Sequence, residues 1–361
     1  MKSSHYYFFM RIYNIMFKNQ YIEHKTKYSY LKNWMSGGAS SIKERLLEYS
    51  KQMYREITDA HQELIIREPI KLGEQDALLA IDVQYDFLPQ GKHQLEKMGE
   101  FAVDEGDEIV DGIKRLMRRF SKSNSQIILT RDYHPKEHVS FGPFPDHCVV
   151  GTKGSEIVKP IAESTKYLCK TGNINVAIKG FFKDIDSYGA VKYGEDYAKT
   201  GNDGNSRLFG CDNDNGCNID HTGSFIVNDL NLIDAATKRD IPNYKSYAKK
   251  ENRLENYLIK RNIKRIFICG LAGDYCVLDT GVNLKQFFGD MVEVYMVFNR
   301  IRFAFVDGKF LTPPSNVLEK YKKNGIKLCW SSCLQSSDIP CEGEKIMTKK
   351  CENFFSQDFD K

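Results

Sequence analysis

Short apolar runs alternate with amphipathic segments through the middle of the chain. The runs have the length and continuous hydrophobicity of strands buried on both faces, and they occupy residues 77–83, 127–130, 176–178, 266–270 and 292–298. Helical spacing of apolar residues marks the segments 109–120, 251–261 and 277–288. This alternation predicts an α/β fold in which a parallel β-sheet is flanked by helices on both faces.

The two ends of the chain and one internal stretch fall outside this alternation. Residues 1–70 are predicted to form an N-terminal extension that is partly helical, because apolar residues recur at helical spacing over 42–66. Residues 71–338 then form the main domain, and the charged residues 339–361 form a flexible tail. Residues 199–223 are rich in Asn, Asp and Gly, which is typical of a surface insertion that contributes no site residue.

Composition narrows the classes of function. The net charge of +4 is small for 361 residues, and we find no basic stripe, so we expect no nucleic-acid partner. No apolar run reaches the roughly 18 residues that a membrane span needs, and the N-terminus is a poor secretory signal. The ten cysteines show no C-x-x-C pair. Free thiols in a reducing compartment explain them best, so we expect a cytoplasmic protein, with a nuclear location also compatible.

Polar residues follow four of the predicted strands. Ligands of parallel sheets bind beyond the carboxyl ends of the strands, so these residues are expected to meet at one site. They occupy the segments 84–87, 131–134, 179–180 and 271–276. We therefore expect the chemistry to be concentrated in these four short segments.

Cys276 follows a predicted strand and a Gly-rich turn and begins a helix. A helix N-terminus stabilises a thiolate and offers free N–H groups for an oxyanion, although a buried core cysteine explains this position equally well. Asp82 lies in an apolar strand and Lys179 ends another. They form either a structural salt bridge or a pair that activates a cysteine, with Asp82 as proton acceptor.

Asp132, His134 and His147 form a candidate metal site. Asp132 and His134 stand two apart at a strand end, and His147 follows a Pro-containing turn. One carboxylate and two imidazoles suit zinc, iron or manganese. A solvated loop accounts for the D-x-H spacing about as well. A second set, Cys211 and Cys217 with His221, lies in the insertion, where a loop without metal is the favoured interpretation.

Five ordered blocks resemble the nicotinamidases of the isochorismatase-like cysteine hydrolase superfamily. The blocks span about 76–313 and read AIDVQYDFLPQG, TRDYHPKEHVSFG, FPDHCVVGTKG, IKGFFKDIDSYGA and GLAGDYCVLDTG. The resemblance implies the three-layer sandwich of that superfamily and the hydrolysis of nicotinamide to nicotinate and ammonia in NAD salvage. It implies a small-molecule substrate, a divalent metal that is most simply zinc, and compatibility with a homo-oligomer.

The resemblance also implies roles for individual residues. Asp82, Lys179 and Cys276 fall on the family's catalytic triad, and Asp132, His134 and His147 fall on its metal ligands. The bond between Leu271 and Ala272 falls on a cis peptide, so the N–H groups of Ala272 and Cys276 would form the oxyanion hole. Phe87, Phe144 and Tyr188 are expected to enclose the substrate.

Two positions depart from the family pattern, and two other functions stay open. Phe144 replaces the usual Trp, and Gly189 replaces the Ser of many relatives. A metal-independent amidase or isochorismatase-type hydrolase is the first alternative, against which the candidate metal set counts. A non-catalytic binding module of the same fold is the second, against which the intact residues of the triad count.

Overall fold

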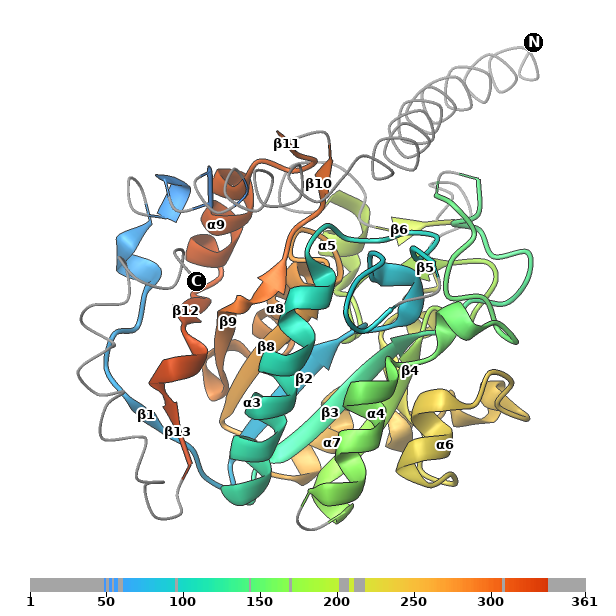
Figure 1. Cartoon of the computed structure of the whole chain (residues 1–361), viewed down its shortest axis with the longest axis horizontal. Helices are drawn as coiled ribbons and strands as arrows, with labels where there is room; N and C mark the ends of the chain where they lie inside the picture. The colour runs from blue at the N-terminus through green and yellow to red at the C-terminus, as the bar shows by residue number, and fades with distance from the viewer. Residues whose placement is uncertain are drawn as a thin grey trace.

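A computed structural model describes residues 49, 52–53, 55–57, 61–94, 97–142, 144–168, 171–200, 208–210, 218–306 and 309–336. Its centre is a seven-stranded sheet with the order β12-β9-β8-β2-β3-β4-β7 (Figure 1). The strands are β2 (Asp76–Ile81), β3 (Gln126–Asp132), β4 (Ile174–Lys179), β7 (Ser224–Ile226), β8 (Arg265–Leu271), β9 (Glu293–Arg302) and β12 (Lys327–Cys329). All neighbours run parallel except β7, which pairs antiparallel with β4.

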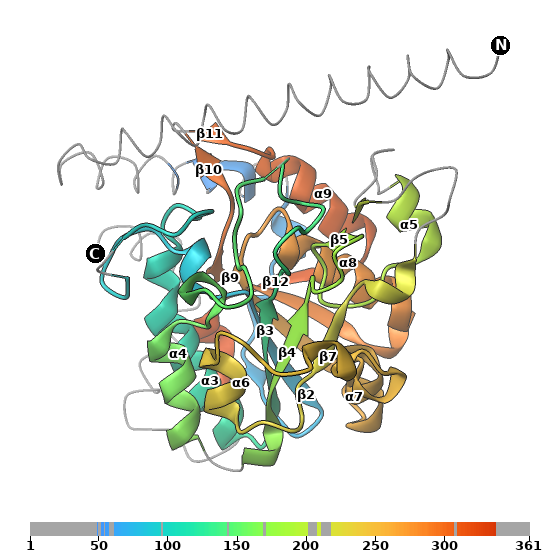
Figure 2. The same cartoon turned by 90° about the vertical axis from the view of Figure 1, so that its right-hand side faces the viewer.

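Helices cover both faces of this sheet, so the domain has the three layers that the sequence predicts (Figure 2). One face carries α3 (Val110–Lys122), α4 (Lys159–Ser164) and α6 (Leu232–Thr237). The other face carries α5 (Glu195–Thr200), α7 (Leu254–Lys260), α8 (Cys276–Phe288) and α9 (Pro314–Lys323). The predicted α/β fold with a mostly parallel sheet is thereby confirmed.

The alternation of side chains along β2 explains why residues 77–81 of this strand are all apolar. Leu78 and Ala80 belong to the core on the α3 side, whereas Leu79 and Ile81 belong to the core on the α8 side. Successive side chains of a strand point to opposite faces, so a strand between two helical layers needs apolar residues at every position. The five predicted strands correspond to β2, β3, β4, β8 and β9.

Part of the predicted N-terminal extension packs on the main domain. Tyr49, Met53 and Ile57 are buried in the core on the α8 side. The Tyr49 hydroxyl accepts a hydrogen bond from the backbone N–H of Phe303 at 3.1 Å. The short strand β1 (Ile70–Lys71) pairs in parallel with β13 (Leu334–Gln335). The structure thus joins the last part of this extension to the core, whereas most of residues 1–70 lie outside the described residues.

Parts of the predicted surface insertion, residues 199–223, pack against the main domain. Strand β6 (Leu208–Phe209) pairs antiparallel with β5 (Asp186–Ser187), and Leu208 is buried in the core. Thr222 is fully buried as well. These contacts differ from the expected surface insertion, because single apolar and hydroxyl side chains anchor a segment whose average composition is polar. Cys211 and Cys217 lie outside the described residues, so the alternative metal set stays a prediction.

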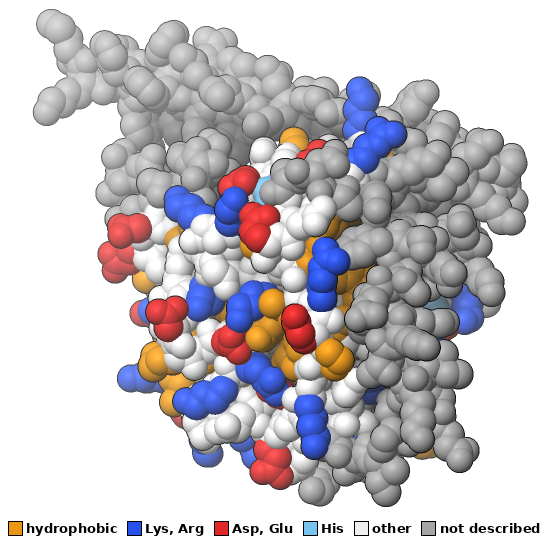
Figure 3. Space-filling view, turned by 90° about the vertical axis from the view of Figure 1, so that its left-hand side faces the viewer, with side chains coloured by type: hydrophobic (Ala, Val, Ile, Leu, Met, Phe, Trp, Pro, Cys, Tyr) orange, Lys and Arg blue, Asp and Glu red, His pale blue; other side chains and the backbone are white. Residues whose placement is uncertain are grey.

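A second short hairpin and a surface with charges of both signs complete the description of the fold. Another short hairpin, β10 (Phe305–Val306) with β11 (Lys309–Phe310), lies above the sheet end. Lys and Arg side chains are interspersed with Asp and Glu over the described part of the face in Figure 3. Among the described residues, no helix has the length and apolar character that crossing a membrane requires.

Candidate active site

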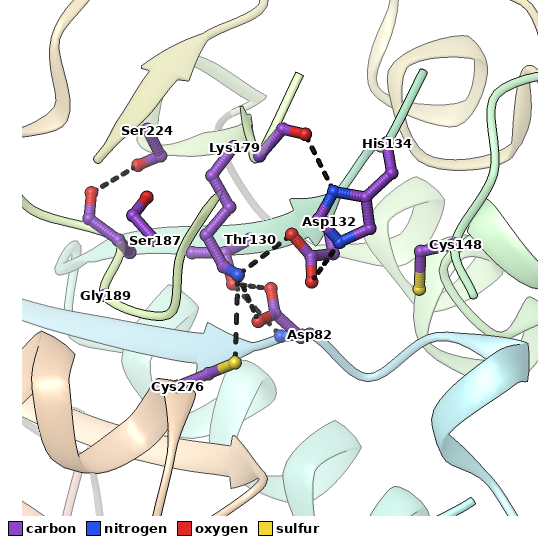
Figure 4. A network of polar contacts seen from close by, with 12 residues as sticks. Asp82, Thr130, Asp132, His134, Cys148, Lys179, Ser187, Gly189, Ser224 and Cys276 are labelled. Atoms are coloured by element: carbon purple, nitrogen blue, oxygen red, sulfur yellow. Dashed lines mark hydrogen bonds and ion pairs between the residues drawn. The ribbon is translucent and has the colours of Figure 1, made fainter. Parts of the chain in front are cut away.

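Four strand ends bring the predicted site residues together, as expected for a parallel sheet. Asp82 follows β2, Asp132 ends β3 and Lys179 ends β4. Cys276 is the first residue of α8, after the turn that leaves β8. Figure 4 shows the side chains of these residues directed toward one another from their separate elements.

The amine of Lys179 lies at the centre of the group. Its Nζ is 3.0 Å from Asp82 Oδ2, 3.0 Å from Asp132 Oδ1 and 3.7 Å from Cys276 Sγ. Lys179, Asp82 and Asp132 are almost completely buried. A buried amine is stable as a cation only when it is paired, and here two carboxylates surround it. Asp132 therefore contacts both the triad and the candidate metal site, which sequence reasoning did not anticipate.

Burial and the neighbouring charges set the protonation of the triad. Burial raises the pKa of Asp82, although Lys179 opposes this shift. Burial favours the neutral amine of Lys179, but Asp132 and Asp82 outweigh it and raise the Lys179 pKa well above its usual value. Burial also raises the pKa of the Cys276 thiol, with Lys179 opposing. With Asp82 and Asp132 ionised, a thiolate would be a third anion beside one cation, so these surroundings favour the thiol form of Cys276.

Thr130 is a site residue that the sequence analysis missed. Its hydroxyl donates a hydrogen bond to Asp82 Oδ1 at 2.6 Å and accepts one from the Asp82 backbone N–H at 3.0 Å. Asp82 has a φ of +47°, a conformation that is unfavourable for non-glycine residues and recurs at functional sites. Thr130 therefore holds the carboxyl and the backbone of Asp82 together. From the sequence alone, Thr130 is recognised only as the end of an apolar strand.

Asp132, His134 and His147 form a compact group that fits a metal ion. One ligand atom from each lies within 4.8 Å of the others, and all three residues are buried. The Nδ1 atoms of both imidazoles face backbone carbonyls, that of Gly180 at 2.8 Å and that of Pro145 at 2.7 Å. Each Nδ1 then carries the proton, which leaves Nε2 as the free ligand atom.

Two further observations support this fit. His134 Nε2 is buried without a hydrogen-bond partner among the described residues, although it lies 3.2 Å from Asp132 Oδ2. Burial, reinforced by the charge of His134, lowers the pKa of His147 to about 4, so this imidazole is neutral at pH 7 as a metal ligand must be. The residues present therefore match the donor set of a divalent metal.

His138 stacks on His134 with a ring separation of 4.0 Å. Its Nδ1 lies 2.7 Å from the Ser140 hydroxyl, and its Nε2 lies 3.2 Å from the carbonyl of Ile185. Both nitrogens thus have partners. The geometric grouping of His138 with His134 and Asp186 makes a second set of potential ligands, but the hydrogen bonds favour a supporting role for His138.

The turn before Cys276 has the features expected of an oxyanion hole. The peptide between Leu271 and Ala272 is cis. The carbonyl of Ala272 accepts hydrogen bonds from the N–H groups of Tyr275 and Val277, which fixes the turn. Within the described part of the chain, the N–H groups of Ala272 and Cys276 have no protein acceptor. They are therefore free to stabilise an oxyanion beside Sγ.

An aromatic cavity opens onto Cys276 and Asp132. Phe87, Phe144 and Tyr188, the three residues predicted to enclose the substrate, all line it. Sequence reasoning missed further lining residues that come from other parts of the chain, namely Phe101, Asp186 and Phe305. The Phe101 ring lies 5.4 Å from Phe144 and 5.0 Å from His147. The walls are mostly apolar, and Cys276, Asp132 and Asp186 add a thiol and two carboxylates to the lining.

The departure at Gly189 has a steric explanation. A Cβ atom at this position would lie 2.6 Å from the side-chain nitrogen of Asn283. That nitrogen donates a hydrogen bond to the carbonyl of Val191 at 3.0 Å. The side chain of Asn283 on α8 thus takes the space beside Gly189, and any larger residue at 189 must displace it.

Comparisons with known proteins agree with this geometry. The isochorismatase domain model matches residues 76–173. The nicotinamidase of Acinetobacter baylyi is 29% identical over 237 residues, which cover 60% of this chain and 78% of that protein. The nicotinamidase of Schizosaccharomyces pombe is 27% identical over 224 residues, which cover 60% of this chain and 79% of that protein.

Among solved structures, the chain resembles a protein from L. infantum in complex with nicotinate. The two chains are 22% identical with a TM-score of 0.48, and the match covers 74% of this chain and 100% of that one. The pyrazinamidase of Pyrococcus horikoshii in complex with zinc has 23% identity and a TM-score of 0.44, covering 71% of this chain and 99% of that one. The family model covers the strand ends that carry Asp82 and Asp132. The sequence comparisons therefore support a nicotinamidase of the isochorismatase-like superfamily.

Proposed function

We propose that this protein hydrolyses nicotinamide to nicotinate and ammonia through a thioester on Cys276, as a step in NAD salvage. The observation that carries the proposal is the buried Asp82–Lys179–Cys276 group, whose Cys276 lines an aromatic cavity. The cavity supplies ring contacts for a flat heteroaromatic amide, and the buried group supplies a nucleophile with its proton acceptor. The nicotinamidase relatives support the same substrate.

The residues suggest the following steps for amide cleavage. Cys276 Sγ attacks the amide carbonyl carbon while its proton passes to Asp82, and the N–H groups of Ala272 and Cys276 stabilise the oxyanion. The carbon–nitrogen bond then breaks as Asp82 returns the proton to the departing ammonia. Water next attacks the thioester, with Asp82 as the base, and releases nicotinate and the Cys276 thiol. A raised Asp82 pKa suits a group that accepts and returns a proton.

Lys179 has an electrostatic part in this sequence. Its ammonium lies between Asp82 and Asp132 and within 3.7 Å of Cys276 Sγ. When Asp82 takes up the thiol proton, negative charge moves to the sulfur and then to the oxyanion. A fixed cation nearby stabilises each of these arrangements, so Lys179 need not give up its own proton.

Asp132, His134 and His147 would hold the metal, which we propose to be zinc, with iron and manganese as alternatives. The bound ion would supply a Lewis acid that orients and polarises the pyridine ring. Phe87, Phe144 and Tyr188 would enclose the ring. A cytoplasmic or nuclear location accompanies this proposal, because Cys148, Cys269, Cys276, Cys329 and Cys333 are all free thiols.

Ammonia release from nicotinamide tests the proposal. We expect turnover by the metal-loaded full chain, a strong loss after dialysis against a chelator, and recovery when zinc is restored. Turnover of other amides or of an isochorismate-type substrate, without turnover of nicotinamide, would identify the sibling hydrolase instead. Nicotinamide binding without ammonia release by metal-loaded enzyme would favour the non-catalytic module.

A further inference from the structure

Two described stretches of the insertion lie against a segment that lines the cavity. We call residues 182–193 the cavity loop, and residues 208–210 together with 218–223 the brace. Asp186 and Tyr188 of the cavity loop line the cavity next to Cys276. The brace itself contributes no lining residue, so any effect on the cavity must pass through the cavity loop.

The first contact between brace and cavity loop is a backbone ladder. Leu208 pairs with Ser187, and Phe209 pairs with Asp186 (Figure 1). The side chain of Leu208 is buried in the core on the α8 side. Gly210 follows with a φ of +82°, and a Cβ atom there would lie 2.0 Å from the carbonyl oxygen of Asp184. The ladder therefore requires a glycine at 210.

The second contact involves the other end of the brace. The backbone N–H of Gly223 donates to the Ser187 hydroxyl at 3.3 Å, and the Thr222 hydroxyl accepts from the Tyr193 backbone N–H at 3.1 Å. Gly223 has a φ of +77°, and a Cβ atom there would lie 2.6 Å from the backbone nitrogen of Lys192. Figure 4 places Ser187 on the side of Lys179 away from His134.

The third contact is a ring stack. The rings of His221 and Phe182 are parallel to within 2° and 3.8 Å apart. His221 Nδ1 also lies 3.4 Å from Asp184 Oδ2, and its Nε2 lies 3.0 Å from the side-chain nitrogen of Asn218. This stack holds the start of the cavity loop, where the chain leaves Lys179.

The catalytic helix holds the remaining part of the cavity loop. The backbone N–H of Ala190 donates to the Thr280 hydroxyl at 2.9 Å. The hydroxyls of Tyr193 and Tyr197 both donate to the buried carboxylate of Asp279, and the Asp279–Tyr197 distance is 3.0 Å. Helix α8 thus contacts residues 190–193, which the brace also reaches through Thr222, whereas the earlier part that carries Asp186 pairs with the brace.

We propose that the brace is a positioning element for the active site, which sets affinity for the aromatic amide by holding Asp186 and Tyr188 at the cavity wall. This inference rests on the proposed function. His221, Gly210 and Gly223 are its positioning residues, and none of them touches the cavity. Backbone ladders and close glycine contacts restrict a loop without adding side chains to a site.

The test compares glycine variants of the full-length, metal-loaded enzyme. Gly210→Ala introduces the contact with Asp184, whereas Gly289→Ala is the matched control, because Gly289 also has a positive φ (+55°) but has nothing within 4 Å of a Cβ atom. His221→Ala removes the ring stack, and His221→Phe retains it. We measure kcat and KM for nicotinamide, bound metal, and amide hydrogen exchange of the cavity loop.

We expect Gly210→Ala and His221→Ala to raise KM by at least about threefold with little change in kcat or metal content. Both should speed exchange in the cavity loop, while Gly289→Ala and His221→Phe stay near wild type. Unchanged KM and exchange in both test variants would overturn the proposal, as would equal effects in test and control variants. If wild type releases no ammonia, the proposed function fails, and the exchange data still decide the positioning role.

Discussion

Replacing Thr130 by Val isolates the contribution of one hydroxyl to the proton acceptor. Valine keeps the shape of the side chain but cannot donate to Asp82 Oδ1, to which the hydroxyl is 2.6 Å away. A hydrogen bond to a charged group contributes about 1.5–3 kcal/mol. One pKa unit corresponds to about 1.4 kcal/mol. If the hydrogen bond is lost mainly from the ionised form, the Asp82 pKa rises by about 1–2 units.

The sign of the rate effect follows from the role of Asp82 as base. Burial already raises the pKa of Asp82, and the Thr130 hydroxyl opposes this shift. Without the hydroxyl, ionised Asp82 appears only at higher pH. We therefore expect the acid limb of the kcat/KM profile to move upward by about 1–2 pH units, with activity approaching wild type above it.

The assay is ammonia release across a pH series, with Thr130→Ser as the control that keeps the hydroxyl. The serine variant should retain the wild-type acid limb. A valine variant with an unmoved acid limb would refute the reasoning, and so would a uniform loss of rate at every pH. A uniform loss would mean that Thr130 acts by shaping the backbone of Asp82, whose N–H it also accepts.

Three further predictions concern the nucleophile, the metal group and its surroundings. Cys276→Ala should leave the fold intact by circular dichroism and lower turnover below about a thousandth of wild type, so higher residual activity would contradict a covalent mechanism. His134→Ala and His147→Ala should each reduce bound metal and raise KM for nicotinamide, and metal analysis equal to wild type would remove them as ligands. Burial, reinforced by His134, lowers the His138 pKa to about 4. As the pH falls, His138 is therefore protonated in the unfolded chain before it is protonated in the folded chain. The metal-free enzyme should lose up to about 3 kcal/mol of its free energy of unfolding between pH 6.5 and 4. The free energy measured by urea unfolding should depend less steeply on pH in the His138→Gln variant than in wild type, and an equal slope would contradict this prediction.

The sequence predicted best where one physical requirement dominates the residue choice. The central residues of β2 and β8 must be apolar because helices cover both faces of the sheet. The sequence therefore predicted that both segments are strands of a buried sheet. The position of Cys276 at the start of a helix could also be predicted, because the strand, turn and helix around it are consecutive in sequence. The convergence of Asp82, Asp132 and Lys179 then followed from the parallel sheet.

Other features depend on partners that lie far away in sequence. Strand β7 has only three residues and no distinctive pattern, because it adds one edge to a completed sheet. Phe101 in a loop and Phe305 in the short strand β10 line the cavity from segments whose paths are set by tertiary packing. Leu208 stands beside Phe209 in an otherwise polar stretch, so its burial against the core left no periodic signal.

The order of pairing in the sheet has a consequence for synthesis on the ribosome. Strand β2 lies between β3 and β8, and its register with β8 joins Asp76 to Arg265. The nascent chain therefore carries a strand, apolar over residues 77–81, that has one partner early and lacks the other until β8 has left the exit tunnel. Strand β1 remains unpaired for longer, because its partner β13 contains Leu334, near the end of the described residues. During that interval the edge of β2 is open to pairing with other chains, so expression yield should depend on chaperone supply more than the stability of the finished domain would suggest.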